Sequence, residues 1–185
     1  MKHLITFITL LLVNQEYIPV NQKDIFGQKQ GFWVESIIEG DRWEYYYKND
    51  TFYGICKTYY GDRQNLSWVG EFENGIDADT WYVFNDQGCI SFKCSDFKAN
   101  KGKRIAYDSG RIVRLPYQAY YTGYYPTGII KQEGLILYDL EETFFNSIEY
   151  GLWKYYDEGG NLVRTKTWEY YDENGNPLNK NLKDE

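Results

Sequence analysis

The residues that could support chemistry are few and scattered along the chain. The only histidine is His3, so the body of the chain lacks the base used in Ser-His or Cys-His catalysis and the usual protein ligand of zinc and iron. Asp77 and Asp79 form the one carboxylate pair suited to glycoside hydrolysis, because residues two apart on a strand share a face and such enzymes need carboxyl groups about 5–9 Å apart. Surface acids beside a turn are the commoner explanation in a chain this acidic.

Metal, thiol and nucleotide sites lack a complete motif. Residues 172–176 begin like a calcium loop, but the glycine falls two positions early and Lys183 stands where the bidentate glutamate belongs. The cysteines Cys56, Cys89 and Cys94 form no C-x-x-C pair, and we interpret them as small strand residues. No Walker-type or dinucleotide-binding glycine motif is present. We therefore expect no catalytic residue, no cofactor and no metal.

A recurring unit of strand and turn organises the rest of the chain. Its clearest copies begin at Trp153 and Trp168, where Trp-x-Tyr-Tyr-Asp-Glu leads into a turn rich in Gly and Asn. Such residues accept the positive φ that tight hairpins need. Related copies begin at Trp43, Lys57 and Trp81. The recurrence predicts an all-β fold, an elongated antiparallel meander of stacked β-hairpins with roughly ten to twelve strands.

The chain divides into four expected parts. Residues 1–13 combine a basic start with an apolar core of about ten residues, which is typical of a secretory signal and too short for a membrane-spanning helix. We expect a signal peptide over residues 1–15, a linker over 16–30, a repeat domain over 31–178 and a polar tail over 179–185. These features predict a secreted, periplasmic or cell-envelope protein with no integral membrane span after signal removal. The alternative is a cytoplasmic protein whose first strand or helix is this apolar segment.

Composition narrows the class of partner. The 185 residues include 20 Tyr, 6 Trp and 10 Phe, which is typical of a strand-rich chain. The net charge of -7 opposes a nucleic-acid or anionic-membrane partner, because the field of the whole protein would repel either one. We expect a protein partner, with a carbohydrate as the other ligand class and no nucleic acid.

Two rows of tyrosines recur within the unit. We expect one row to lie in the core and the other to form an exposed stripe, which suits a protein partner or a sugar. The alternative is that all the rings stack as ladders between repeats. The candidate partner-binding aromatics are Tyr46, Tyr60, Tyr156 and Tyr171, and the preceding row is Tyr45, Tyr59, Tyr155 and Tyr170.

Residues 68–75, Trp-Val-Gly-Glu-Phe-Glu-Asn-Gly, and the strand at 81–84 resemble the MORN repeat, whose motif is aromatic-x-Gly-x-aromatic-x-x-Gly. The Gly-x-Trp-x-Tyr-Tyr-Asp-Glu-x-Gly pattern at 151–160 is similar to the variant repeat of bacterial YwqK-type proteins. The resemblance extends over residues 27–178 in separate modules. It implies stacked β-hairpins and a binding or scaffolding role. Some YwqK-type members are designated antitoxins.

We therefore expect a non-catalytic binding or scaffolding protein that engages a protein partner through its aromatic-rich sheet. The first alternative is an antitoxin or immunity protein that neutralises a cognate toxin. The second is a carbohydrate-binding or glycoside-active protein, for which Asp77 and Asp79 are the candidate carboxylates.

Overall fold

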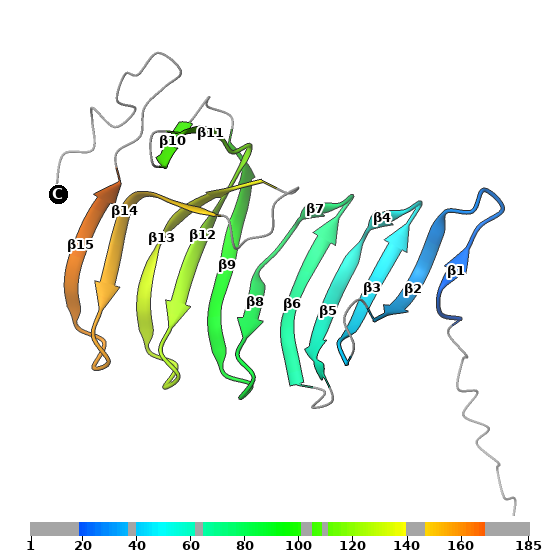
Figure 1. The fold of residues 1–185 in the computed structure, drawn as a ribbon, viewed down its shortest axis with the longest axis horizontal. Helices are drawn as coiled ribbons and strands as arrows, with labels where there is room; N and C mark the ends of the chain where they lie inside the picture. Colours follow the sequence, from blue (N-terminus) through cyan, green and yellow to red (C-terminus); the bar gives the residue numbers. More distant parts are fainter. Residues whose placement is uncertain are drawn as a thin grey trace, which may run out of the picture.

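One open antiparallel sheet makes up most of the structure. The computed structural model describes residues 19–36, 40–61, 65–100, 105–108, 111–139 and 147–168, and these contain strands but no α-helix. The sheet has 13 strands in the order β1-β2-β3-β5-β6-β8-β9-β12-β13-β14-β15, with β4 beside β3 and β7 beside β6. Its strands follow one another along the long axis of the molecule (Figure 1). The predicted all-β meander is confirmed.

The strands of the main sheet lie beside one another in chain order, and the hairpin β10–β11, which falls between β9 and β12 in the chain, forms a separate two-stranded sheet. The bounds are β1 Gln22–Lys23, β2 Lys29–Glu35, β3 Arg42–Lys48, β4 Thr51–Phe52, β5 Gly54–Tyr60, β6 Asn65–Glu73, β7 Ile76–Asp77, β8 Trp81–Phe84, β9 Ile90–Ala99, β10 Ile105–Asp108, β11 Arg111–Arg114, β12 Tyr117–Tyr124, β13 Ile130–Tyr138, β14 Ile148–Tyr156 and β15 Leu162–Trp168. Short connections therefore place residues close in sequence side by side in the sheet.

The array begins earlier than the sequence indicates. The hairpin β1–β2 starts at Gln22, inside the stretch of residues 16–30 that we expect to be a linker. The stretch is polar, which conceals the turn that joins β1 to β2. The expected signal peptide at 1–15 and tail at 179–185 lie outside the described residues.

One face of the sheet carries a continuous row of aromatic rings, which we call the aromatic ladder. Ring centroids lie 4.9 Å apart for Tyr45 and Phe52, 5.3 Å for Phe52 and Phe72, and 5.2 Å for Phe72 and Trp81. Trp81 joins this group to the next one, which includes Phe92, Cys94, Tyr121 and Trp153. The ladder consists of Trp33, Tyr45, Tyr47, Phe52, Trp68, Phe72, Trp81, Phe92, Tyr121, Trp153 and Tyr155. A sheet of a single layer thus builds its core from rings that cover one another.

Two glycines make room for the largest rings. A Cβ atom at Gly70 would lie 2.4 Å from the ring of Trp81, and one at Gly134 would lie 2.5 Å from the ring of Trp153. Each indole therefore lies flat over the backbone of the neighbouring strand. Trp153 is only 1% exposed, and its Nε1 donates to the Leu135 carbonyl at 2.9 Å. The glycine of the aromatic-x-Gly-x-aromatic pattern is thus required by packing.

The opposite face of the sheet carries an apolar cluster near β12 to β14. There Leu115, Leu137 and Tyr150 form a small apolar cluster, and Leu137 is fully buried. Along β3 and β5 this face is more open, since Tyr46 and Ile55 are both largely exposed. The two faces therefore have different roles, because the ladder face supplies the core.

Candidate binding surfaces

The four candidate tyrosines do not form one exposed stripe. Tyr46 is 42% exposed on the face opposite the ladder, and its ring lies 5.1 Å from that of Phe32. Tyr156 is half-buried on the same face, and its hydroxyl donates to Glu133 Oε1 at 2.7 Å. Tyr171 lies outside the described residues.

Tyr60 lies on the other face of the sheet, so the expectation of one row is wrong for this residue. Trp43 of β3 pairs directly with Thr58 of β5, and residues two apart share a face. Tyr60 therefore lies on the ladder face with Trp43, whereas Tyr46 does not. The Tyr60 hydroxyl donates to the Phe84 carbonyl at 2.7 Å. The sequence alignment matches Lys57 of β5 with Trp43, but in the sheet Thr58 pairs with Trp43. The alignment is therefore off by one residue and assigns the β5 side chains to the wrong faces.

Tyrosine hydroxyls on the face opposite the ladder are bonded to carboxylates within the sheet. Glu44 is 8% exposed, forms an ion pair with Arg42 and accepts the Tyr59 hydroxyl at 3.0 Å. Desolvation and then this bond raise the pKa of Tyr59, whereas the bond to Glu133 is the main cause of the raised pKa of Tyr156. These hydroxyls are already engaged, which leaves apolar ring surface as the main feature offered to a ligand.

Asp77, the first of the two candidate carboxylates, lies in the core. It is 5% exposed, and its Oδ2 accepts the Tyr138 hydroxyl at 2.8 Å, across 61 positions of sequence. Among the described residues its Oδ1 has no hydrogen-bond partner. Burial raises the pKa of Asp77 to about 6, even though the bond from Tyr138 acts to lower it. Asp79 is exposed, so the two carboxylates lie in different environments.

Asp77 takes the place that an aromatic ring has in the preceding repeat. Phe52 follows the tight turn at Asn49 and Asp50, where both φ angles are positive, and Asp77 follows the equivalent turn at Asn74 and Gly75. Phe52 packs against ladder rings. The buried Asp77 carboxylate thus connects β7 to β13 by a hydrogen bond. At the same position of the preceding repeat, Phe52 is held by packing against aromatic rings.

The acidic residues and the cysteines bear on metal and thiol chemistry. Within the described ranges no group of three His, Cys, Asp or Glu side chains could hold a metal ion. Cys56 and Cys94 are buried, Cys89 is half-buried, and none is in a disulfide. Burial raises the pKa of Cys56 to about 11 and that of Cys94 to about 12. The calcium-like residues 172–176 lie outside the described part of the chain.

Among the described residues, the most exposed large apolar side chains lie at the tip of the first hairpin. Ile25 is 93% exposed and Phe26 is 81% exposed, in the turn between β1 and β2. The turn is held by four bonds. Asp24 Oδ1 accepts the amides of Phe26 and Gln28 at 2.8 and 3.0 Å, and the backbone bonds Gly27 N to Asp24 O and Asp24 N to Gln28 O are each 3.0 Å. We call residues 24–28 the apolar tip.

Hydrogen bonds also hold the Asp24 side chain in its charged form. Gln30 Nε2 donates to Asp24 Oδ2 at 3.0 Å. Desolvation acts to raise the pKa of Asp24, but the bonds from Gln28, Gln30 and Phe26 outweigh it and lower this pKa. The tip is therefore a preorganised turn whose two central side chains extend into solvent.

Three further turns of the same chain have this backbone geometry. The bonds Gly88 N to Asn85 O, Gly128 N to Tyr125 O and Gly160 N to Asp157 O are 2.8 to 3.0 Å long, and each glycine has φ between 82° and 84°. The residues at their two central positions are Asp86 and Gln87, Pro126 and Thr127, and Glu158 and Gly159. None of these is a large apolar residue. The turn itself therefore does not require Ile25 and Phe26.

Sequence reasoning missed the apolar tip. The signal was present, because Asp24 and Gly27 have the same spacing as Asp157 and Gly160. The unit was recognised by its tryptophan and paired tyrosines, and the first hairpin lacks them before its turn.

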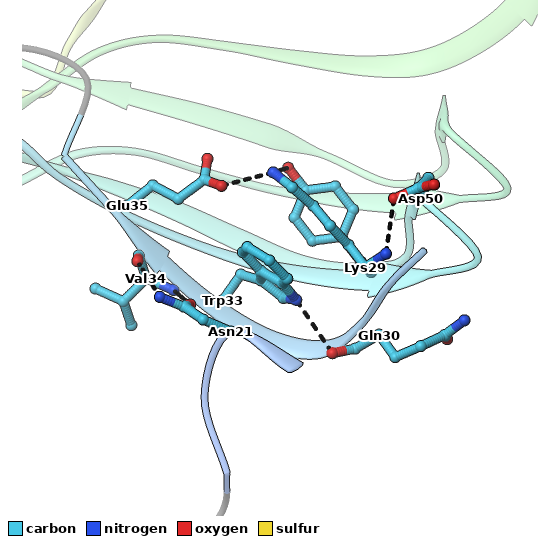
Figure 2. A network of polar contacts seen from close by, with 8 residues as sticks. Asn21, Lys29, Gln30, Trp33, Val34, Glu35 and Asp50 are labelled. Carbon is cyan, nitrogen blue, oxygen red and sulfur yellow. Dashed lines mark hydrogen bonds and ion pairs between the residues drawn. The ribbon is translucent and has the colours of Figure 1, made fainter. Parts of the chain in front are cut away.

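The edge of the sheet at β2 is capped at the end of this hairpin away from the tip. The Asn21 side chain pairs with the backbone of Val34, as Nδ2 donates to the carbonyl at 3.1 Å and Oδ1 accepts the amide at 2.8 Å (Figure 2). Lys29 Nζ lies 2.6 Å from Glu35 Oε1 and 4.5 Å from the centre of the Trp33 ring. Asn21 therefore occupies backbone groups that another strand could otherwise use.

The described residues contain no helix that is long and apolar enough to cross a membrane. No protein-family model matches the chain, and no curated protein matches it.

Proposed function

We propose that this chain is a non-catalytic binding module of the MORN-like, YwqK-type kind that engages a protein partner. The observation that carries the proposal is the apolar tip, where Ile25 and Phe26 are 93% and 81% exposed on a rigid turn. The same turn elsewhere in the chain carries polar or small residues. An apolar pair that neither packing nor turn geometry requires is best explained by what it binds.

The energy available from this tip is large for so few atoms. Burying an Ile or a Phe side chain in a partner contributes about 1.5–3 kcal/mol each. The turn is already ordered by the Asp24 bonds, so little conformational entropy is lost on binding. Two anchors at one point are typical of an interface whose affinity depends on a few residues.

A protein pocket suits this tip better than an anionic membrane surface. The whole chain has a net charge of -7, and Asp24 lies within the tip in a hydrogen-bonded, ionised form. A negative bilayer would repel both charges. A pocket with apolar walls can accept the side chains of Ile25 and Phe26 while the Asp24 carboxylate stays in its own turn.

The proposal predicts the loss of one partner when the tip is made polar. A double variant, Ile25→Ser with Phe26→Ser, should fold normally because both side chains are exposed. Its affinity for the partner should fall about a hundredfold or more, in line with about 3–6 kcal/mol of lost apolar burial. Cross-linked capture from the source cell, quantified by mass spectrometry against the natural protein, measures the change.

A matched variant controls for unspecific effects of changing a turn. Pro126→Ser with Thr127→Ser alters the two central, exposed residues of the equivalent turn between β12 and β13. This variant should capture the same partner as the natural protein. Equal capture by all three proteins would contradict the proposal. A captured toxin would identify the module as an immunity protein, which is the special case with a single cognate partner.

Export belongs to the same proposal. It is motivated by the basic start and the apolar core of residues 1–13. Fractionation of the source cell and N-terminal sequencing should find the protein outside the cytosol with these residues removed. Recovery of a cytosolic protein that begins at Met1 would refute export and favour a cytoplasmic binding module.

A further inference from the structure

The edge of the sheet opposite β1 is formed by β15, and the described residues show no cap on it like the one on β2. β15 is seven residues long, and among the described strands it pairs only with β14. Its first six residues are exposed. β1 and β15 lie at opposite ends of the molecule (Figure 1). Within the described part of the chain, the exposed residues 162–167 therefore present backbone amides and carbonyls on the side away from β14, which form a template for another strand.

Two cations lie on this edge strand, on the ladder face. Lys166 pairs directly with Trp153, and Arg164 pairs directly with Tyr155. The Arg164 guanidinium lies 4.3 Å from the Tyr155 ring centre, and Lys166 Nζ lies 3.2 Å from that of Trp168. Within the described part of the chain, neither cation has a carboxylate within ion-pair distance. In a protein with a net charge of -7, this places two positive charges on one open edge.

We propose that β15 binds an extended segment of a partner protein that carries acidic side chains at alternate positions. Strand addition would pair the unpaired backbone groups. Residues two apart on the added strand share a face, so two acids at that spacing would lie opposite Arg164 and Lys166. Opposite charges that face each other across a strand pair stabilise it.

The same charges disfavour a second copy of this chain. In the two-fold antiparallel pairing that aligns all seven residues of β15, Arg164 lies opposite Lys166. Like charges directly opposite destabilise a strand pair. The charges of β15 thus disfavour pairing with a second copy of this chain and favour pairing with an acidic strand. This binding site uses the other end of the sheet from the apolar tip, so the two proposals fail independently.

A synthetic peptide tests the assignment on the full-length protein. The probe is a capped, fluorescent Thr-Val-Thr-Glu-Thr-Glu-Thr-Val-Thr peptide, followed by fluorescence anisotropy and by hydrogen exchange of the β15 amides. We expect binding that weakens as salt is added and that protects amides of Leu162–Trp168. A peptide with lysine in place of both glutamates should bind at least about tenfold more weakly. The absence of binding by the acidic peptide would overturn the proposal.

Matched protein variants test the role of the two cations. Arg164→Glu with Lys166→Glu should reverse the preference, so that the lysine peptide binds better than the glutamate peptide. Lys48→Glu with Lys131→Glu makes the same change in net charge on exposed residues of β3 and β13, which are interior strands. This control should keep the natural preference. Equal affinity of both variants for the acidic peptide would overturn the proposal.

N-methylation of the peptide tests whether the backbone pairs. Successive amides of a strand point to opposite edges, so methyl groups on the Val and Glu amides block one edge and methyl groups on the Thr amides block the other. Either peptide alone can still pair through its free edge, in the parallel or the antiparallel direction, but a peptide with methyl groups on both sets of amides should lose binding. Undiminished binding of the fully methylated peptide would mean that no strand is added, and the proposal would be wrong.

Discussion

A Trp153→Ala variant is expected to lose about 3–5 kcal/mol of unfolding free energy, the range found for the truncation of buried aromatic residues. Trp153 is 1% exposed, packs 5.6 Å from the ring of Tyr121, and donates to the Leu135 carbonyl. Its removal opens a cavity over Gly134 and interrupts the aromatic ladder. Urea denaturation followed by tyrosine and tryptophan fluorescence measures the loss.

Two further variants assign this loss to the ring. Leu152→Ala changes the adjacent residue, which is 49% exposed, and should cost less than about 1 kcal/mol. Gly134→Ala should destabilise the natural protein by about 1–3 kcal/mol, because the new methyl group would overlap the indole, and should cost much less in the Trp153→Ala background. Equal effects of Gly134→Ala in both backgrounds would show that the glycine does not serve the ring.

The stability of the protein is expected to fall as the pH rises from about 4 to above 6, because of Asp77. Burial raises its pKa to about 6 from an ordinary value of 3.8, so the folded state binds this proton more tightly than the unfolded state. The resulting stabilisation is complete below the unfolded pKa and is lost as the pH rises through the folded pKa. Its size is on the order of 3 kcal/mol.

Replacement of Asp77 isolates this effect. Asp77→Asn should gain stability relative to the natural protein as the pH rises from 4 to 7, and the difference should then level off. Tyr138→Phe removes the bond that lowers the pKa of Asp77, so its stability should fall over a wider range that extends to higher pH. Urea unfolding at several pH values measures each profile. Parallel profiles for the natural protein and Asp77→Asn would contradict the assignment.

The repeating unit of the sequence predicts the fold because hairpin signals and side-chain alternation are local properties. Trp153 and Tyr155 lie two apart on the ladder face, and the turn after Tyr156 forms at Asp157, as the pattern indicates. Side-chain alternation predicts the wrong face where copies of the unit that match in sequence do not have the same register in the sheet. Tyr60 lies on the ladder face because β5 pairs through Thr58, and this register depends on the neighbouring strand.

The candidate sites were harder to predict because their character depends on burial. Asp77 follows a turn and lies two residues before Asp79, so by sequence it is a surface acid, yet the Tyr138 hydroxyl reaches it from 61 residues away. Ile25 and Phe26 lie in a polar stretch, where two apolar residues indicate local packing. Only the position of this turn at the end of a hairpin shows that both side chains are exposed.

The most direct test of the binding account places a photoreactive residue at the apolar tip. p-Benzoylphenylalanine in place of Phe26 keeps an aromatic side chain at a position that is 81% exposed, and the same residue in place of Thr127 provides the matched turn. Irradiation of the source cell should yield one discrete covalent adduct with a protein at position 26 and none at position 127. The same adducts at both positions, or none at position 26, would contradict the assignment of the tip as the binding anchor.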